Sequence, residues 1–138
     1  MKLTNPISAF CILLLPSAAL GADCFPDGGD RVGLPWGALT EAAWDARRRM
    51  CDNIDCGYQK NCTTKSGGKT ASSGNFKWRA DVNLDRWTTG GQGFSECWKA
   101  TEGIIQKCIL SGKTSGGTSS YNGQQYRLSM DVRVIKYV

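Results

Sequence analysis

Residues 95–110 read SECWKATEGIIQKCIL, which is the pattern of an amphipathic helix. At a period of 3.6 residues one stripe carries Cys97, Thr101, Ile104, Ile105 and Cys108, and we expect this stripe to face a core. The two cysteines would lie about 16 Å apart along the helix axis, at ~1.5 Å per residue, whereas bridged Cα atoms lie roughly 4.4 to 6.8 Å apart. They therefore cannot bond each other, and each is predicted to bond to a different part of the chain.

The start of the chain has the layout of a secretory signal peptide. Lys2 provides a positive charge, residues 7–20 are mostly apolar, and small residues follow up to Ala22. We expect residues 1–21 to be the signal peptide, with cleavage after Gly21 or Ala22, and residues 22–138 to be a single domain. This pattern predicts a secreted, extracellular protein without stable insertion into a membrane.

Cysteine usage agrees with an oxidising compartment. Removal of the signal peptide also removes Cys11 and leaves an even number of cysteines, which predicts three disulfides. The six that remain are Cys24, Cys51, Cys56, Cys62, Cys97 and Cys108. Of the fifteen pairings that six cysteines allow, twelve remain, and in each of them both helix cysteines bond to the first four cysteines. No metal site is expected, because the chain has neither histidine nor Cys-x-x-Cys spacing.

Periodicity predicts the other regular elements. Pro35 suits the first turn of a second amphipathic helix, which ends near Asn53. Strict alternation of apolar and polar residues predicts half-buried strands over residues 76–84 and 126–134. The pair Asn122-Gly123 favours a hairpin turn before the second of these strands.

Segments rich in Gly, Ser and Thr are expected to connect these elements. Residues 65–74, 85–93 and 111–120 are predicted as loops, residues 24–34 as an arm held by Cys24, and residues 56–62 as a short strand with a turn. The order of elements predicts an α+β two-layer sandwich, stapled by disulfides, with two helices packed on one face of an antiparallel sheet of about four strands. The other face of the sheet is polar and is expected to be in water.

The composition disfavours most enzyme classes. Without histidine there is no Ser-His-Asp or Cys-His catalysis, and six bridged cysteines leave no thiol nucleophile. Hydrolysis by paired carboxylates is the remaining route, and Asp81 and Asp131 are candidate neighbours. Cross-strand pairing with Arg79, Arg127 and Arg133 accounts for them better. We expect a protein that is not an enzyme and needs no cofactor. Its mild net charge of +5 does not predict nucleic-acid binding.

Surface recognition is the class of function that remains. Trp87 interrupts the strand alternation and has Asp85 and Arg86 beside it. An exposed aromatic ring flanked by polar groups suits stacking on the face of a sugar. The alternative is that Trp87 packs under the start of the helix, against Phe94 or Trp98.

Two further sites are candidates. Tyr121 and Asn122, at the predicted hairpin, form a second possible ligand-binding pair. Asn61-Cys62-Thr63 fits the Asn-x-Thr acceptor pattern for N-glycosylation, although its middle residue is a predicted disulfide partner.

The cysteine pattern resembles that of a known family. The chain has the segment CFPDGG at residues 24–29, a helix ending in Cys51, a later Cys62, and then Cys97 and Cys108 on one helix before a Gly-rich loop. This pattern is similar to that of the mushroom glycan-binding lectin family of small secreted fungal proteins. The spacing also resembles fungal killer-toxin-like and effector proteins. The resemblance implies a two-layer α/β sandwich and the binding of glycans or cell-surface glycoconjugates. The alternative that it implies is a toxin or effector acting on a competitor or host cell.

The chain departs from the lectin family at its end. It has no cysteine after Cys108, where that family commonly closes on one, so no terminal disulfide and no sugar-contacting residue is carried over.

Glycan binding and toxin action would require different surfaces. A glycan binder should expose Trp87, whereas a charge-driven toxin should gather basic residues on one face, namely Lys77, Arg79, Arg127 and Arg133.

Overall fold

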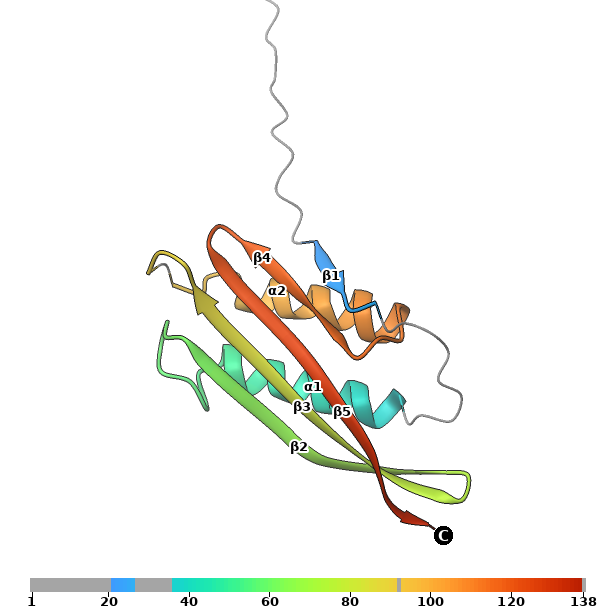
Figure 1. Cartoon of the computed structure of the whole chain (residues 1–138). Coiled ribbons are helices and arrows are strands. Elements are labelled where there is room, and N and C mark those ends of the chain that lie inside the picture. The colour runs from blue at the N-terminus through green and yellow to red at the C-terminus, as the bar shows by residue number, and fades with distance from the viewer. Residues whose placement is uncertain (1–20, 27–35, 92, 138) are drawn as a thin grey trace, which may run out of the picture.

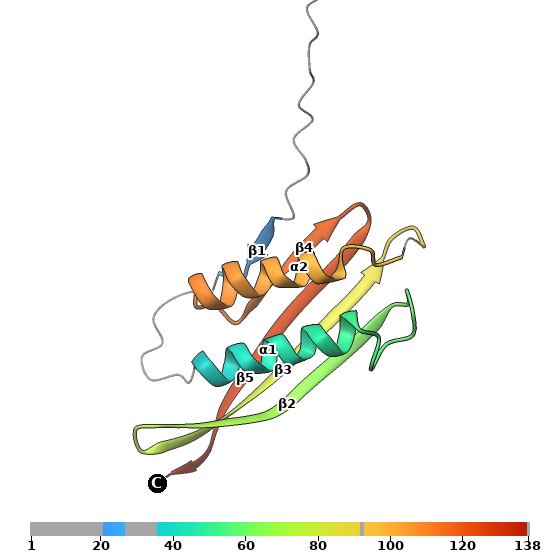
Figure 2. The same cartoon turned by 180° about the vertical axis from the view of Figure 1, so that it is seen from behind.

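The computed structural model of the chain describes residues 21–26, 36–91 and 93–137. Its elements, in chain order, are β1 (Ala22–Cys24), α1 (Trp36–Cys51), β2 (Cys62–Ser73), β3 (Phe76–Thr88), α2 (Cys97–Ile104), the π-helix η1 (Ile105–Ser111), β4 (Gly116–Tyr121) and β5 (Gln124–Tyr137). The strands form one antiparallel sheet in the order β1-β4-β5-β3-β2. Both helices cover the same face of this sheet (Figures 1 and 2). The predicted two-layer α+β architecture is confirmed, but the sheet has five strands, not about four.

The additional strand is β1, at one edge of the sheet. It pairs with β4, with Ala22 opposite Ser119 and Cys24 opposite Gly117. Three residues are too short to show an alternating pattern, so the sequence indicated only an arm here. The predicted signal peptide up to residue 20 and the rest of the arm, residues 27–35, lie outside the described residues.

The helix predicted over residues 95–110 is confirmed as α2 and η1. All five residues of its apolar stripe are at most 3% exposed, and they are Cys97, Thr101, Ile104, Ile105 and Cys108. The helix is an α-helix up to Ile104 and continues as a π-helix through η1. Its buried side chains share one core with those of α1 and of the inner face of the sheet.

The first helix is also confirmed and ends at Cys51. Its buried face is formed mainly by small side chains, which let it lie close to β2 and β3, and comprises Leu39, Ala42, Ala43, Ala46 and Met50. On its outer side, the Arg47 guanidinium lies 5.3 Å from the Trp44 ring and 4.7 Å from the Trp98 ring, which connects α1 to α2.

Three segments predicted as loops contain strand. Residues 65–73 belong to β2, 85–88 to β3 and 116–120 to β4. The polar β2 pairs with β3 from Cys62 to Ser66 and, after a register shift, from Lys69 to Ser73, and small polar residues such as Thr64 and Ser66 fill its buried side. Backbone pairing rather than side-chain pattern holds such a strand, which is why composition alone predicted a loop. The short strand predicted at 56–62 is wrong, since residues 52–60 form turns and a bend and β2 begins at Cys62.

Three disulfides join the second helix to the sheet, join the two helices to each other, and close one loop. They are Cys24–Cys108, Cys51–Cys97 and Cys56–Cys62. The second helix is thus bonded to β1 and to the end of α1, and the prediction that Cys97 and Cys108 do not bond each other is confirmed. The predicted hairpin turn is confirmed too, because Asn122 and Gly123 have φ of 51° and 81° between the paired residues Tyr121 and Gln124.

Candidate functional site

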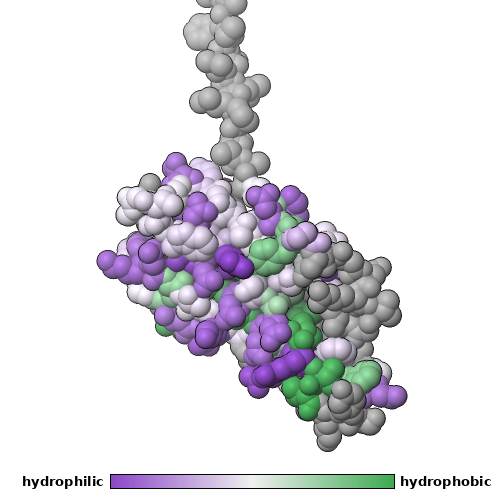
Figure 3. Space-filling model, viewed as in Figure 1, coloured by the Kyte–Doolittle hydropathy of each residue, from purple (hydrophilic) through white to green (hydrophobic). Residues whose placement is uncertain are grey.

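The face of the sheet opposite the helices, here called the outer face, is the candidate functional surface. Along β3 the buried residues Val82, Leu84 and Arg86 point inward and alternate with Asp85 and Trp87 on the outer face. Figure 3 shows that hydrophilic residues cover much of the outer face. The predicted polar face is therefore present.

A row of polar residues crosses all five strands on the outer face. Cα pairing places Thr63 opposite Asp85, Asp85 opposite Arg127, Arg127 opposite Thr118, and Thr118 opposite Asp23. Side chains directly opposite each other in an antiparallel pair are close neighbours. The Thr63 hydroxyl accordingly donates a 2.6 Å hydrogen bond to Asp85 Oδ1. Donors and acceptors thus alternate along a single line.

An open depression of about 530 Å³ lies at one end of this row. The residues that line it are Asn61, Cys62, Thr63, Asp85, Arg86, Trp87 and Arg127. Its volume is within the roughly 300–1,000 Å³ that is usual for ligand sites. The depression combines an aromatic ring, a carboxylate, a guanidinium, a hydroxyl and an amide, so it offers both stacking and hydrogen bonding.

Trp87 is on the outer face and is 38% exposed, opposite Gln125. It does not pack under the helix. Phe94 is buried on the other side of the sheet, edge-on to Tyr126, and Trp98 is on α2, where it is 40% exposed. Of the two placements that the sequence left open for Trp87, the structure favours the exposed one.

Arg86, predicted beside Trp87 as a ligand-binding residue, is only 3% exposed. Its guanidinium donates to the carbonyl oxygens of Lys60 at 2.9 Å and Gly57 at 3.1 Å and to Asn53 Oδ1 at 3.0 Å, and it lies 4.5 Å from the Phe94 ring. Burial lowers the pKa of this guanidinium. The prediction needed an exposed guanidinium, whereas this one is committed to holding the loop before β2. The alternation of β3 explains this burial, because Arg86 lies between two outward-facing residues.

Arg127 supplies an exposed guanidinium in its place. It is opposite Asp85 on β5, and its guanidinium carbon lies 5.4 Å from the centroid of the Phe25 ring, which follows β1. A cation over an aromatic face is attracted to it, so Phe25 helps to orient Arg127. Sequence reasoning placed Arg127 on the polar face but did not assign it to the site, because its position beside Asp85 depends on the register of two strands distant in sequence.

The second predicted pair is elsewhere. Tyr121 and Asn122 are at the β4–β5 turn, and neither lines the depression. The positive φ of Asn122 serves the turn, and the carbonyl oxygen of Gly123 accepts a 3.1 Å hydrogen bond from the amide of Thr89. The structure therefore does not bring this pair together with Trp87.

The two carboxylates considered for hydrolysis are direct neighbours, since Asp81 is opposite Asp131. Asp81 forms ion pairs with Arg79 at 3.2 Å and with Arg133 at 3.8 Å. The Arg133 contact crosses from β5 to β3, as predicted, whereas Arg79 pairs with Asp81 within β3 and Arg127 is opposite Asp85. Among the described residues, no group of histidine, cysteine or acidic side chains could hold a metal ion.

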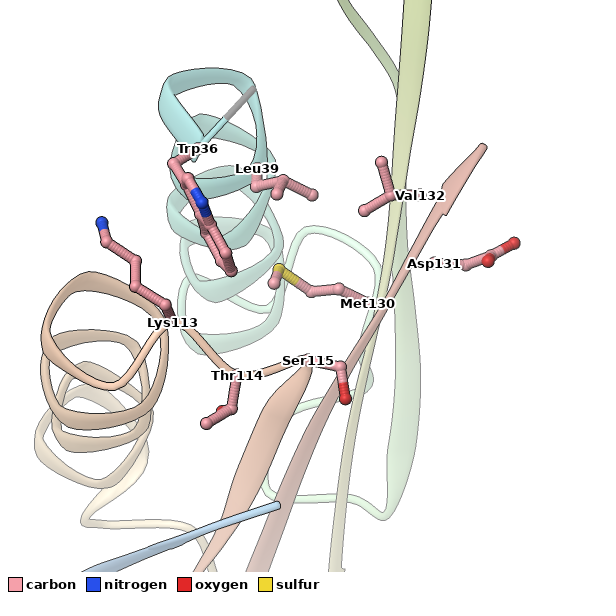
Figure 4. A pocket seen from close by; sticks show the side chains of 8 residues that line it. All are labelled: Trp36, Leu39, Lys113, Thr114, Ser115, Met130, Asp131 and Val132. Atoms are coloured by element: carbon pink, nitrogen blue, oxygen red, sulfur yellow. The ribbon is translucent and has the colours of Figure 1, made fainter. Parts of the chain in front are cut away.

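A separate small cavity of about 90 Å³ lies between the start of α1, residues 113–115 and β5. Figure 4 shows Trp36, Leu39 and Met130 around it, while the Asp131 carboxylate points away. The Lys113 ammonium lies 5.1 Å from the centroid of the Trp36 ring. This cavity shares no lining residue with the depression, so it does not form part of the candidate site.

Comparisons with known proteins add no relative. No family model, no curated protein and no solved structure matches the chain. The likeness to glycan-binding lectins thus remains a prediction from cysteine spacing. In the described part of the chain, no helix is long and apolar enough to cross a membrane.

Proposed function

We propose that this protein is a secreted glycan-binding protein and that the depression around Trp87 is its binding site. The observation that carries the proposal is a partly exposed indole on a mostly polar sheet face, within an open depression that also holds Asp85 and Arg127. The three disulfides agree with an extracellular location.

Three of the lining groups have distinct parts in binding a sugar. The apolar C–H groups of a pyranose ring lie against the Trp87 indole, which removes apolar surface from water. The Asp85 carboxylate accepts hydrogen bonds from sugar hydroxyls, and the Arg127 guanidinium donates to hydroxyl or carbonyl oxygens. Because Thr63 already donates to Asp85 and Phe25 lies beside Arg127, both charged groups are held in place before the ligand arrives.

A glycan array with purified protein tests this proposal. Trp87→Ala should lower the affinity for the bound glycan by about 30-fold, since truncating an aromatic residue at the centre of a site commonly costs about 2 kcal/mol or more. Trp98→Ala is the matched control, because Trp98 is 40% exposed against 38% for Trp87 but is on the helical layer. An array without signal for the wild type, or equal losses in both variants, would refute the proposed site.

A toxin or effector acting on a competitor or host cell is the second candidate function. It is favoured by the presence of Arg79, Arg127 and Arg133 on the same outer face. Asp81 is among these arginines and pairs with two of them, which weakens any long-range positive field. Growth inhibition by the pure protein that is lost in an Arg127→Gln, Arg133→Gln variant but kept in Trp87→Ala would favour this function over glycan binding.

A further inference from the structure

We infer that an N-linked glycan on Asn61 of this same chain occupies the Trp87 depression, so that glycosylation regulates the binding site. The inference rests on the proposed function and on secretion. Asn61 is exposed and lines the depression together with Trp87, and it is the acceptor residue of the sequence Asn61-Cys62-Thr63.

Strand register places the acceptor beside the ring. Cys62 is opposite Arg86 in the β2–β3 ladder, so Asn61 extends that ladder by one step toward the position opposite Trp87. Cys62 and Arg86 share the inner side of the sheet, and their neighbours Asn61 and Trp87 therefore share the outer side. A sugar attached to Asn61 begins its chain next to the indole face.

The hydrogen bonding of Asn61 is compatible with an attached sugar. Its Oδ1 accepts a 3.2 Å hydrogen bond from the backbone amide of Thr88, which fixes the side chain against β3. An N-glycosidic bond is formed by Nδ2 and leaves Oδ1 as an acceptor, so this contact persists in the modified protein. Asn61 also borders a neighbouring hollow of about 410 Å³ that is lined by Gln59, Lys60, Thr88 and Gly91. The space around the side chain is therefore open on both sides.

Modification has to precede folding of this region. In the folded protein the Thr63 hydroxyl donates to Asp85 and Cys62 is bonded to Cys56, so neither is available to a transferase. On the unfolded chain, Asn61 Nδ2 attacks C1 of the first sugar of a lipid-linked diphosphate oligosaccharide. The N–C1 bond forms, the C1–O bond to phosphate breaks, the lipid diphosphate leaves with the electron pair, and the amide loses one proton to a base of the transferase.

The consequence is competition at one site. A tethered sugar has a high effective concentration near Trp87, so it displaces free glycans without any new contact. Glycosylated protein should bind an array at least 10-fold more weakly than protein without the modification. The glycosylated and unmodified forms of this chain would then differ in ligand affinity.

The experiment uses the full chain secreted from a eukaryotic host, with Asn61→Gln and Thr63→Ala as two independent ways to remove the acceptor pattern. We expect only the wild type to carry a glycan. When an amidase releases this glycan in heavy-oxygen water, mass spectrometry should find the heavy oxygen at position 61. The fluorescence of Trp87 is identified as the component that is lost in the Trp87→Phe variant. Quenching of this component by acrylamide should increase after the glycan is released, and binding to the glycan array should increase as well.

Each outcome bears on one claim. If Asn61 carries no glycan, the inference is overturned, and the array result for the unmodified protein still tests the proposed function separately. If Asn61 is glycosylated but Trp87 is quenched equally before and after release, the sugar does not occupy the depression and the inference is likewise overturned. Protection of Trp87 that disappears on release supports the inference even if no free glycan binds.

Discussion

Arg86 shows how one buried side chain can organise a loop. Its guanidinium donates to carbonyl and amide oxygens and lies over the Phe94 ring, and these groups balance its charge. Carbonyl dipoles gathered around a cation stabilise it, and the cation in turn fixes the carbonyls. Arg86 therefore connects β3 to residues 57–60, the loop that leads to Asn61.

Truncation of Arg86 should be among the most destabilising single changes in the chain. Arg86→Ala leaves two backbone carbonyls without their donor, each at a cost of about 1–3 kcal/mol, so we expect a loss of roughly 3 kcal/mol or more in the free energy of unfolding. Urea titration measures it. Arg127→Ala, on the exposed face, is the control and should change stability by about 0.5 kcal/mol or less. Similar losses in both variants would contradict the structural role of Arg86.

Tyr126 should make stability fall at alkaline pH. Burial raises the pKa of its phenol above the ordinary value of about 10, and the nearby Arg86 charge only partly opposes this. The folded protein then keeps a proton that the unfolded chain releases, so the free energy of unfolding is unaffected below about pH 10 and decreases above it, by about 1.4 kcal/mol per pH unit. Tyr126→Phe should lessen this dependence. Equal slopes for wild type and variant from about pH 9 to about pH 11 would contradict the prediction.

At the scale of single elements, the β1 strand depends on a glycine in its partner. A Cβ atom at Gly117 would lie 2.5 Å from the Asp23 carbonyl oxygen and 2.7 Å from Cys108 Sγ. Both contacts are too short, so a side chain at this position would separate β1 from β4. The Cys24–Cys108 bond lies directly against this glycine.

Gly117→Ala should therefore loosen β1 and lower the melting temperature by several degrees. Gly37→Ala is the matched control, because a Cβ there meets no atom within 4 Å, and alanine in the α1 helix should be neutral or stabilising by up to about 1 kcal/mol. Hydrogen exchange of the β4 amides localises the effect. A Gly117→Ala protein as stable as Gly37→Ala would show that β1 does not need this close approach.

Local sequence patterns determine which helices, strands and turns could be predicted. The strands with strict alternation, the two amphipathic helices and the Asn122-Gly123 turn each carry a local signal, and all are present. Edge strands β1 and β2 carry none, because they are held by backbone pairing and a disulfide. Trp87 could be identified from its break in the pattern. Thr63 and Arg127 could not, since only the pairing of β2, β3 and β5 brings them to Asp85.

Across the whole molecule, stability and the proposed recognition depend on opposite sides of the sheet. Two disulfides, Cys24–Cys108 and Cys51–Cys97, tie the second helix to β1 and α1, whereas the depression opens on the face that no described helix covers. The third, Cys56–Cys62, is different, because it closes the loop that leads into the depression. Changes to the disulfides should therefore separate the two properties.

Replacing each disulfide by a pair of alanines tests this separation. Chain-entropy estimates give a loss of about 4.5 kcal/mol for the bond that spans 84 residues and of about 2 kcal/mol for the bond that spans 6. Cys24→Ala, Cys108→Ala should thus melt at a much lower temperature but keep most of the proposed glycan affinity while folded, since neither cysteine lines the depression and only the Phe25 contact of Arg127 depends on β1. Cys56→Ala, Cys62→Ala should be the more stable of the two and yet bind more weakly, because the loop before β2 is freed and Cys62 itself lines the site. Calorimetry and glycan binding on the same samples measure both effects. Parallel losses of stability and binding in the two variants would mean that the depression depends on the entire fold rather than on the loop that Cys56–Cys62 closes.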